Sequence, residues 1–125
     1  MREILIQEGV RTDLGRYLFE PKSICIYPDE VTPIFYGLPP RRHFLGHAVD
    51  MERDKDGVIS MDLHFMDPHF GGEGGEKLLK ECDITFYGNN IEWVDKEDKH
   101  VYRIFIREVL VVPVGSWPSG FPRSE

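Results

Sequence analysis

Two histidines four residues apart are the first residues whose spacing could serve chemistry. On a helix, His43 and His47 would present two metal ligands on one face, but Phe44 stands where an HExxH motif carries its glutamate. The alternating apolar residues around them favour a strand instead, in which the two histidines are about 13 Å apart and cannot share an ion. We therefore expect His47 to be a core histidine that is hydrogen-bonded to the backbone.

An acidic strand face is the second candidate. If the segments around Asp50 and Asp62 pair as antiparallel strands, these two carboxylates face one another and His64 lies one step along the same face. Opposed carboxylates repel unless a cation lies between them, and such groups suit Mg²⁺, Mn²⁺ or Ca²⁺. The three residues are thus a candidate site for a weak divalent cation, and no other cofactor is expected. The alternative is a solvated strand surface, where exposed carboxylates cost little.

Nucleophilic and phosphate chemistry have little support in the sequence. The glycine-rich stretch 70–76 lacks the Gly-Lys-Ser/Thr ending of a P-loop and is interpreted as a linker. Cys25 lies in a short apolar segment, where a buried thiol is inert. Cys82 lies between Glu81 and Asp83, whose charges should raise the pKa of its thiol. We predict no catalytic nucleophile.

Two arginines and two aromatic residues are candidates for an interface with another protein. Arg41 and Arg42 follow a stiff Pro-Pro pair and could contact an acidic partner, and the alternative for them is a solvated turn. Trp117 and Phe121 lie in a proline-rich tail, and large aromatic residues are favoured interface anchors. The alternative for the tail is that it folds back and caps one end of the domain.

The element that must position the acidic face is a hairpin over residues 44–66. Both arms alternate apolar and polar residues with a period of two, which is typical of half-buried strands. A turn at residues 55–57, with Gly57 in the left-handed position, would join them. That turn predicts a register in which Val49 lies opposite Leu63, so that the large apolar side chains share one face and the acids share the other.

A second hairpin is predicted from residues 91–94 and 100–114, joined by the all-charged stretch 95–99. Arg107 and Glu108 interrupt the apolar run of the second arm, which indicates a bend or a bulge there. Three further short strands are predicted at 3–7, 23–27 and 84–87. One helix of about two turns is predicted at 75–82.

These elements predict a mostly β fold, a small antiparallel barrel or sandwich of about five to seven short strands with one short helix. An α+β arrangement is the alternative. We expect one β-rich domain over residues 1–114 and a Pro/aromatic C-terminal tail over 115–125, which cannot continue a strand.

The composition limits the class of protein. The chain has 125 residues, 41% of them hydrophobic, and a formal net charge of −7; this suits one folded domain and neither a disordered nor a membrane protein. The acidic balance argues against a nucleic-acid partner. Residues 1–7 are too short and too charged for a signal peptide, and two cysteines without CxxC spacing fit a reducing compartment. We therefore expect a cytoplasmic protein with no membrane partner.

Two strings in the chain resemble small uncharacterised proteins encoded by tailed bacteriophages of actinobacteria. They are FLGHAVD at 44–50 with DKDG at 54–57, and VVPVGSWP at 111–118. The resemblance covers about half of the chain and carries no catalytic motif. It implies an accessory phage protein of unrecorded activity, located in the cytoplasm of the infected host.

Three functions remain open at this point. The favoured one is a non-enzymatic protein-binding module that forms homo-oligomers and also binds a host or phage protein. The second is a small divalent-metal-dependent hydrolase or nuclease that uses Asp50, Asp62 and His64. The third is a structural component of the virion.

Overall fold

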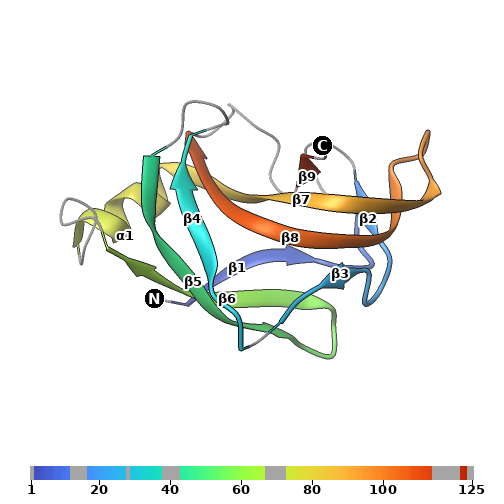
Figure 1. Ribbon diagram of the computed structural model, residues 1–125, viewed down its shortest axis with the longest axis horizontal. Helices are drawn as coiled ribbons and strands as arrows, with labels where there is room; N and C mark the ends of the chain where they lie inside the picture. The colour runs from blue at the N-terminus through green and yellow to red at the C-terminus, as the bar shows by residue number, and fades with distance from the viewer. Residues whose placement is uncertain are drawn as a thin grey trace.

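The computed structural model describes residues 2–11, 17–27, 29–37, 43–66, 73–113 and 122–123 of the chain. These residues form one sheet that curls into a nearly closed barrel, with a short helix at one end (Figure 1). The elements in chain order are β1 (Arg2–Gln7), β2 (Leu18–Phe19), β3 (Ile24–Cys25), β4 (Thr32–Tyr36), β5 (His43–Arg53), β6 (Val58–Phe65), α1 (Glu73–Lys80), β7 (Cys82–Asp95), β8 (His100–Pro113) and β9 (Pro122–Arg123). The prediction of a small, mostly β barrel with one short helix is confirmed.

In the described part of the chain, β8 pairs with four other strands, more than any other strand does. β7 pairs with it antiparallel over its whole length. The other edge of β8 pairs in parallel with three short strands in turn, β2, β3 and β4 (Figure 1). The sheet is thus mixed rather than purely antiparallel. These parallel pairings join segments far apart in the sequence, which local alternation cannot reveal.

The described part contains nine strands, more than the five to seven expected, because β2, β3 and β9 are only two residues long. Conversely, the strands predicted at 84–87 and 91–94 are one strand of 14 residues, β7. Gly88 lies in the middle of β7, where a Cβ atom would be 2.6 Å from Cδ1 of Ile104. Asn90 follows with a φ of 54° at a shift of the register. β7 therefore continues through this stretch as a bulged strand.

The hairpin predicted over 44–66 is present as β5 and β6, with its turn where the sequence indicates it. Gly57 has a φ of 81°, the left-handed conformation that glycine tolerates best. The Asp54 carboxylate accepts hydrogen bonds from two amides of the turn, at 2.8 and 2.9 Å. Close to the turn, pairs such as Arg53 opposite Ile59 follow the predicted register.

Farther from the turn the register of this hairpin shifts by one residue. Asp50 has a φ of 54°, and beyond it Ala48 rather than Val49 lies opposite Leu63. A shift of one residue reverses which side chains of a strand point inward. Accordingly Ala48 is fully buried and Val49 is only half-buried. The predicted pairing of Val49 with Leu63 is therefore wrong, whereas the inward orientation of Leu63 is confirmed.

The second predicted hairpin is confirmed as β7 and β8. Tyr87 lies opposite Glu108 and Gly88 lies opposite Ile106, so Arg107 is an extra residue in β8. The predicted interruption at Arg107 is thus a bulge. β8 ends at Pro113, as expected for a residue that cannot donate a hydrogen bond to a neighbouring strand.

The hydrophobic core fills the interior of the barrel. The rings of Phe19 and Phe86 lie 5.9 Å apart, and Tyr17 contacts both Phe19 and Trp93 at 6.1 Å. The largest fully buried side chains are Phe19, Phe86, Ile24, Ile34, Leu45, Ile59, Met61, Ile104, Leu110, Val101, Val109 and Val111. Every strand of the two predicted hairpins contributes to this list, and so do β2, β3 and β4.

The C-terminal segment differs from expectation in one respect. Pro122 and Arg123 pair in parallel with Phe86 and Tyr87 of β7 and form the edge strand β9. The prediction that the tail cannot form a strand is therefore wrong. A proline is tolerated in a strand at the edge of a sheet, where its missing amide leaves no neighbouring carbonyl unpaired.

Candidate functional site

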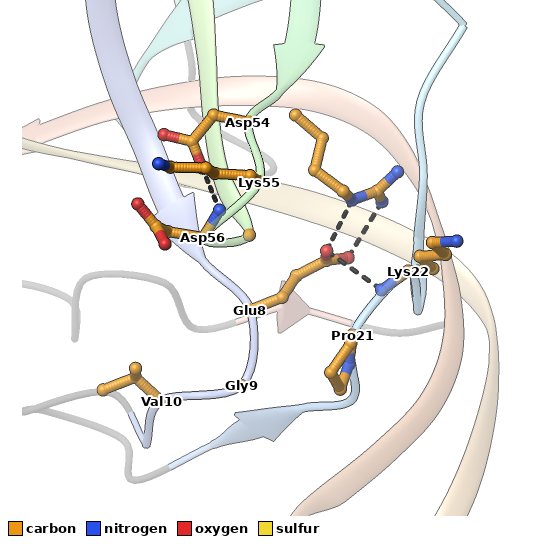
Figure 2. A pocket seen from close by; sticks show the side chains of 10 residues that line it. Glu8, Gly9, Val10, Pro21, Lys22, Asp54, Lys55 and Asp56 are labelled. Carbon is orange, nitrogen blue, oxygen red and sulfur yellow. Dashed lines mark hydrogen bonds and ion pairs between the residues drawn. The ribbon is translucent and has the colours of Figure 1, made fainter.

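A hollow of about 370 Å³ lies beside the end of β1 (Figure 2). Three segments meet around it: the residues after β1, the turn before β3, and the turn of the β5–β6 hairpin. Its lining residues are Glu8, Gly9, Val10, Pro21, Lys22, Arg53, Asp54, Lys55, Asp56 and Gly57. We call it the Glu8 hollow.

Glu8 is a fully buried carboxylate whose two oxygens are both occupied. Arg53 donates from Nε to Oε1 at 2.5 Å and from Nη2 to Oε2 at 2.9 Å. The backbone amides of Lys22 and Ile24 donate to the same two oxygens, at 3.0 and 2.9 Å. Each oxygen thus accepts one bond from the guanidinium and one from the backbone. Because both oxygens are saturated in this way, the carboxylate acts as a clamp between three segments rather than as a proton acceptor.

No local sequence pattern predicts this clamp. Glu8 is an isolated acid before a glycine, and Arg53 stands in the charged stretch between the two predicted arms of the hairpin. The two residues meet because β1 lies beside β6, so that Glu8 reaches the turn of the hairpin, where its amide donates to the Gly57 carbonyl at 2.8 Å. Such a pairing depends on tertiary structure and leaves no local pattern.

A second hollow, of about 250 Å³, lies on the other side of the Pro21–Lys22 turn. Glu20 lines it and forms a hydrogen bond with Nε2 of His100. A histidine that is hydrogen-bonded to a carboxylate supplies the base and the acid of a catalytic triad. The third member of a triad is the nucleophile, a serine or threonine hydroxyl or a cysteine thiol. The other described residues that line the hollow are Pro21, Lys22, Tyr102 and Arg103, so no serine, threonine or cysteine is among them.

The predicted acidic face is arranged differently from the expectation. Because of the shift at Asp50, Asp62 lies opposite Val49 and not opposite Asp50. The predicted pairing of the two carboxylates is therefore wrong. Among the residues that the structure describes, no group of three or more His, Cys, Asp or Glu side chains is placed to hold a metal ion.

Arg2 of β1 supplies the positive charge on this face. Its Nη1 donates to the Asp50 carbonyl at 2.7 Å and lies 3.5 Å from Oδ2 of Asp62. Its Nη2 lies 3.3 Å from Oε2 of Glu52. An arginine from the neighbouring strand thus stands among the acids, so the repulsion that suggested a metal ion has a compensating charge within the chain.

His47 is not a core residue, contrary to expectation. It is half-buried and lies opposite the exposed His64, on the outer face of the sheet. The Asp50 bulge is the reason, because it turns His47 and Val49 outward, whereas the uninterrupted register would have placed them inward. The ring of Phe44 contacts the His47 ring edge-on, with the centroids 5.3 Å apart.

Apolar side chains gather at the same end of the outer face. Phe44 is 42% exposed and Met66 is 64% exposed, and the Met66 amide donates to the Leu45 carbonyl at 2.7 Å, which places the two side chains at one end of the hairpin. The ring of Phe35 in β4 contacts that of Phe44, with the centroids 5.7 Å apart. We call Phe35, Phe44, His47 and Met66 the outer patch. No sequence pattern predicts this patch, since Phe44 and Met66 stand at the two ends of the predicted hairpin.

The thiol of Cys82 is deactivated as expected. Burial raises its pKa, and the negative charges of Glu81 and Asp83 raise it further. Because the thiolate is the nucleophile, a raised pKa lowers the reactive fraction at neutral pH. Cys25 lies half-buried in β3.

The four predicted interface residues, Arg41, Arg42, Trp117 and Phe121, lie outside the described residues. Their role stays a prediction. In the part of the chain that the structure describes, no helix has both the length and the apolar character needed to cross a membrane.

Comparison of the chain with protein-family models, with curated proteins and with solved structures finds no match in any of the three.

Proposed function

We propose that this chain is a non-enzymatic binding protein that associates with copies of itself through the outer patch. The observation that supports the proposal is the exposure of Phe44 and Met66, 42% and 64% respectively, at the same end of the β5–β6 hairpin. Aromatic residues and methionine are enriched in protein interfaces relative to the rest of the surface. Phe35 and His47 support Phe44 from either side, so the ring is already held in place before a partner binds.

The charge of the chain favours a second copy meeting this patch rather than another surface. With a net charge of −7, two copies repel one another over most approaches. None of the four residues of the outer patch carries a negative charge, so the repulsion is least there. A two-fold axis would bring the same patch of both copies together and bury both phenylalanine–methionine pairs at once.

Light scattering at rising protein concentration tests the proposal. The unmodified chain is expected to exceed the mass of a monomer at high micromolar concentration, and the double variant Phe44→Ser/Met66→Ser is expected to stay monomeric. The matched control is Val31→Ser/Val94→Ser, which removes two equally exposed apolar side chains (57% and 52%) elsewhere on the surface, and it should associate like the unmodified chain.

Two outcomes would contradict the proposal. One is an unmodified chain that is monomeric throughout the series, and the other is equal loss of association in the test and control variants. Circular dichroism of each variant shows whether the sheet is intact. Divalent-metal-dependent cleavage of phosphoester substrates, abolished by Asp62→Ala, would favour the hydrolase instead. The predicted anchors Trp117 and Phe121 belong to the same proposal, and their replacement by serine should weaken association further.

A further inference from the structure

We propose that His47 and His64 form a binding site for one transition-metal ion of the class that prefers imidazole, namely Cu²⁺, Ni²⁺ or Zn²⁺. The site keeps His64 from the site expected from the sequence, but it replaces Asp50 and Asp62 with His47 and would select a different class of ion. It does not depend on self-association, because both ligands come from one chain.

The register of β5 and β6 carries the inference. His47 and His64 are directly opposite one another in this antiparallel pair, so their side chains leave the same face of the sheet. Directly opposed residues have Cβ atoms about 4.5–5.5 Å apart, which lets the two rings converge on one ion. The Asp50 bulge creates this pairing, since the uninterrupted register would have placed Ala48 opposite His64.

The ring nitrogens of this pair are not engaged elsewhere. Within the described part of the chain, neither His47 nor His64 has a hydrogen bond or an ion pair. By contrast, Nε2 of His100 is bound to Glu20, and His43 also has a polar or ring partner. Within the described residues, the two histidines that face one another therefore keep their nitrogens available to a ligand.

The surroundings orient one ring and leave the other accessible. Phe44 holds the His47 ring edge-on, and Pro33 is the residue opposite His47 on β4, so little freedom of this ring is lost on binding. His64 is exposed, which leaves room for an ion that completes its coordination with water. Neutral imidazole is a good ligand for copper, nickel and zinc and a poor one for Mg²⁺ or Ca²⁺.

Isothermal titration of the full chain, without a histidine tag, at neutral pH with CuCl₂, NiCl₂ or ZnCl₂ tests this site. We expect one ion per chain and the tightest binding for Cu²⁺. His47→Ala and His64→Ala should each weaken binding at least about tenfold, since even the loss of a group behind a metal ligand costs that much. The control His43→Ala removes an exposed histidine of the same strand that does not face another histidine, and its affinity should be unchanged. MgCl₂ should show no binding.

The results separate this site from its alternatives. One ion per two chains would still support it, with both imidazole pairs sharing the ion. The absence of binding by all three metals up to millimolar concentration would overturn the proposal, and so would equal affinities in the unmodified chain and both test variants. Because titration at low micromolar protein also detects binding by monomers, a metal site can be found even if the outer patch does not self-associate.

Discussion

Glu8 shows how a single buried carboxylate connects distant parts of this barrel. It follows β1, and its oxygens hold Arg53 at the end of β5 and the amides of Lys22 and Ile24 before and within β3. Arg53 donates in addition to the Ile24 carbonyl. All of these groups are satisfied together, so removing one partner leaves several others unpaired in a buried place.

Replacement of Glu8 by alanine is therefore expected to lower the free energy of unfolding by about 3–5 kcal/mol, the usual cost of leaving one member of a buried pair alone. Urea denaturation measures the loss. The matched control is Glu52→Ala, because Glu52 also pairs with an arginine but its side chain is 73% exposed; the expected loss there is about 1 kcal/mol or less.

If Glu8→Ala does not fold, Glu8→Gln gives the same information. It keeps the shape of the side chain and weakens the bond to the guanidinium, so its cost should lie between those of the other two variants. Equal costs for Glu8→Ala and Glu52→Ala would show that the clamp contributes nothing.

At the scale of the elements, the bulge at Asp50 decides which residues of the β5–β6 hairpin meet. Asp50 adopts the left-handed conformation, with a φ of 54°, which aspartate and asparagine tolerate better than β-branched residues. Its carbonyl accepts a hydrogen bond from Arg2 of β1, a strand that pairs with β6 and not with β5. The bulge is thus held both by the choice of residue and by a contact from a third strand.

Asp50→Val is expected to lower the free energy of unfolding by about 1–2 kcal/mol, because a β-branched residue is sterically strained in the left-handed conformation. Asp50→Asn should leave it nearly unchanged. The control is Glu52→Val, two residues along the same strand and without a positive φ, which should be tolerated. Thermal unfolding compares the three, and an equal decrease of the melting temperature for both valine variants would contradict the strain at Asp50.

The two hairpins could be predicted from the sequence because they are local. Period-two alternation and a glycine in the turn predicted β5 and β6, and the charged pair Arg107 and Glu108 in an apolar run predicted an irregularity in β8. The Asp50 bulge could not be predicted, because the residues around it keep a perfect alternation and the contact that supports it comes from Arg2. The acidic site inherited this error, since a shift of one residue exchanges the two faces of a strand.

At the scale of the whole molecule, the barrel is built from pairings between distant parts of the chain. β1 pairs with β6 and β4 with β8, while only the two hairpins, together with β4 and β5, join neighbours in sequence. Most of these strands could be predicted from the sequence, but their pairing partners could not. Turn residues predict a pairing only between two strands that follow one another in the chain.

Such a topology predicts slow folding. The chain must lose the conformational entropy of closing long loops before contacts between distant strands can stabilise the fold. Proteins of this size that are rich in β structure fold in about milliseconds to seconds. Stopped-flow refolding from urea, followed by the fluorescence of Trp93, which packs against the core, measures the rate. Refolding complete within tens of microseconds would contradict the prediction.

The row of short strands along β8 has one more consequence. β7 pairs with β8 along its whole length, whereas the opposite edge of β8 pairs with β2, β3 and β4 in three separate places. Backbone ladders made of short pieces can open piece by piece, without unfolding of the rest. β8 thus has one edge that is paired along its whole length and one edge that can open locally. Water that enters the barrel should enter along the second edge.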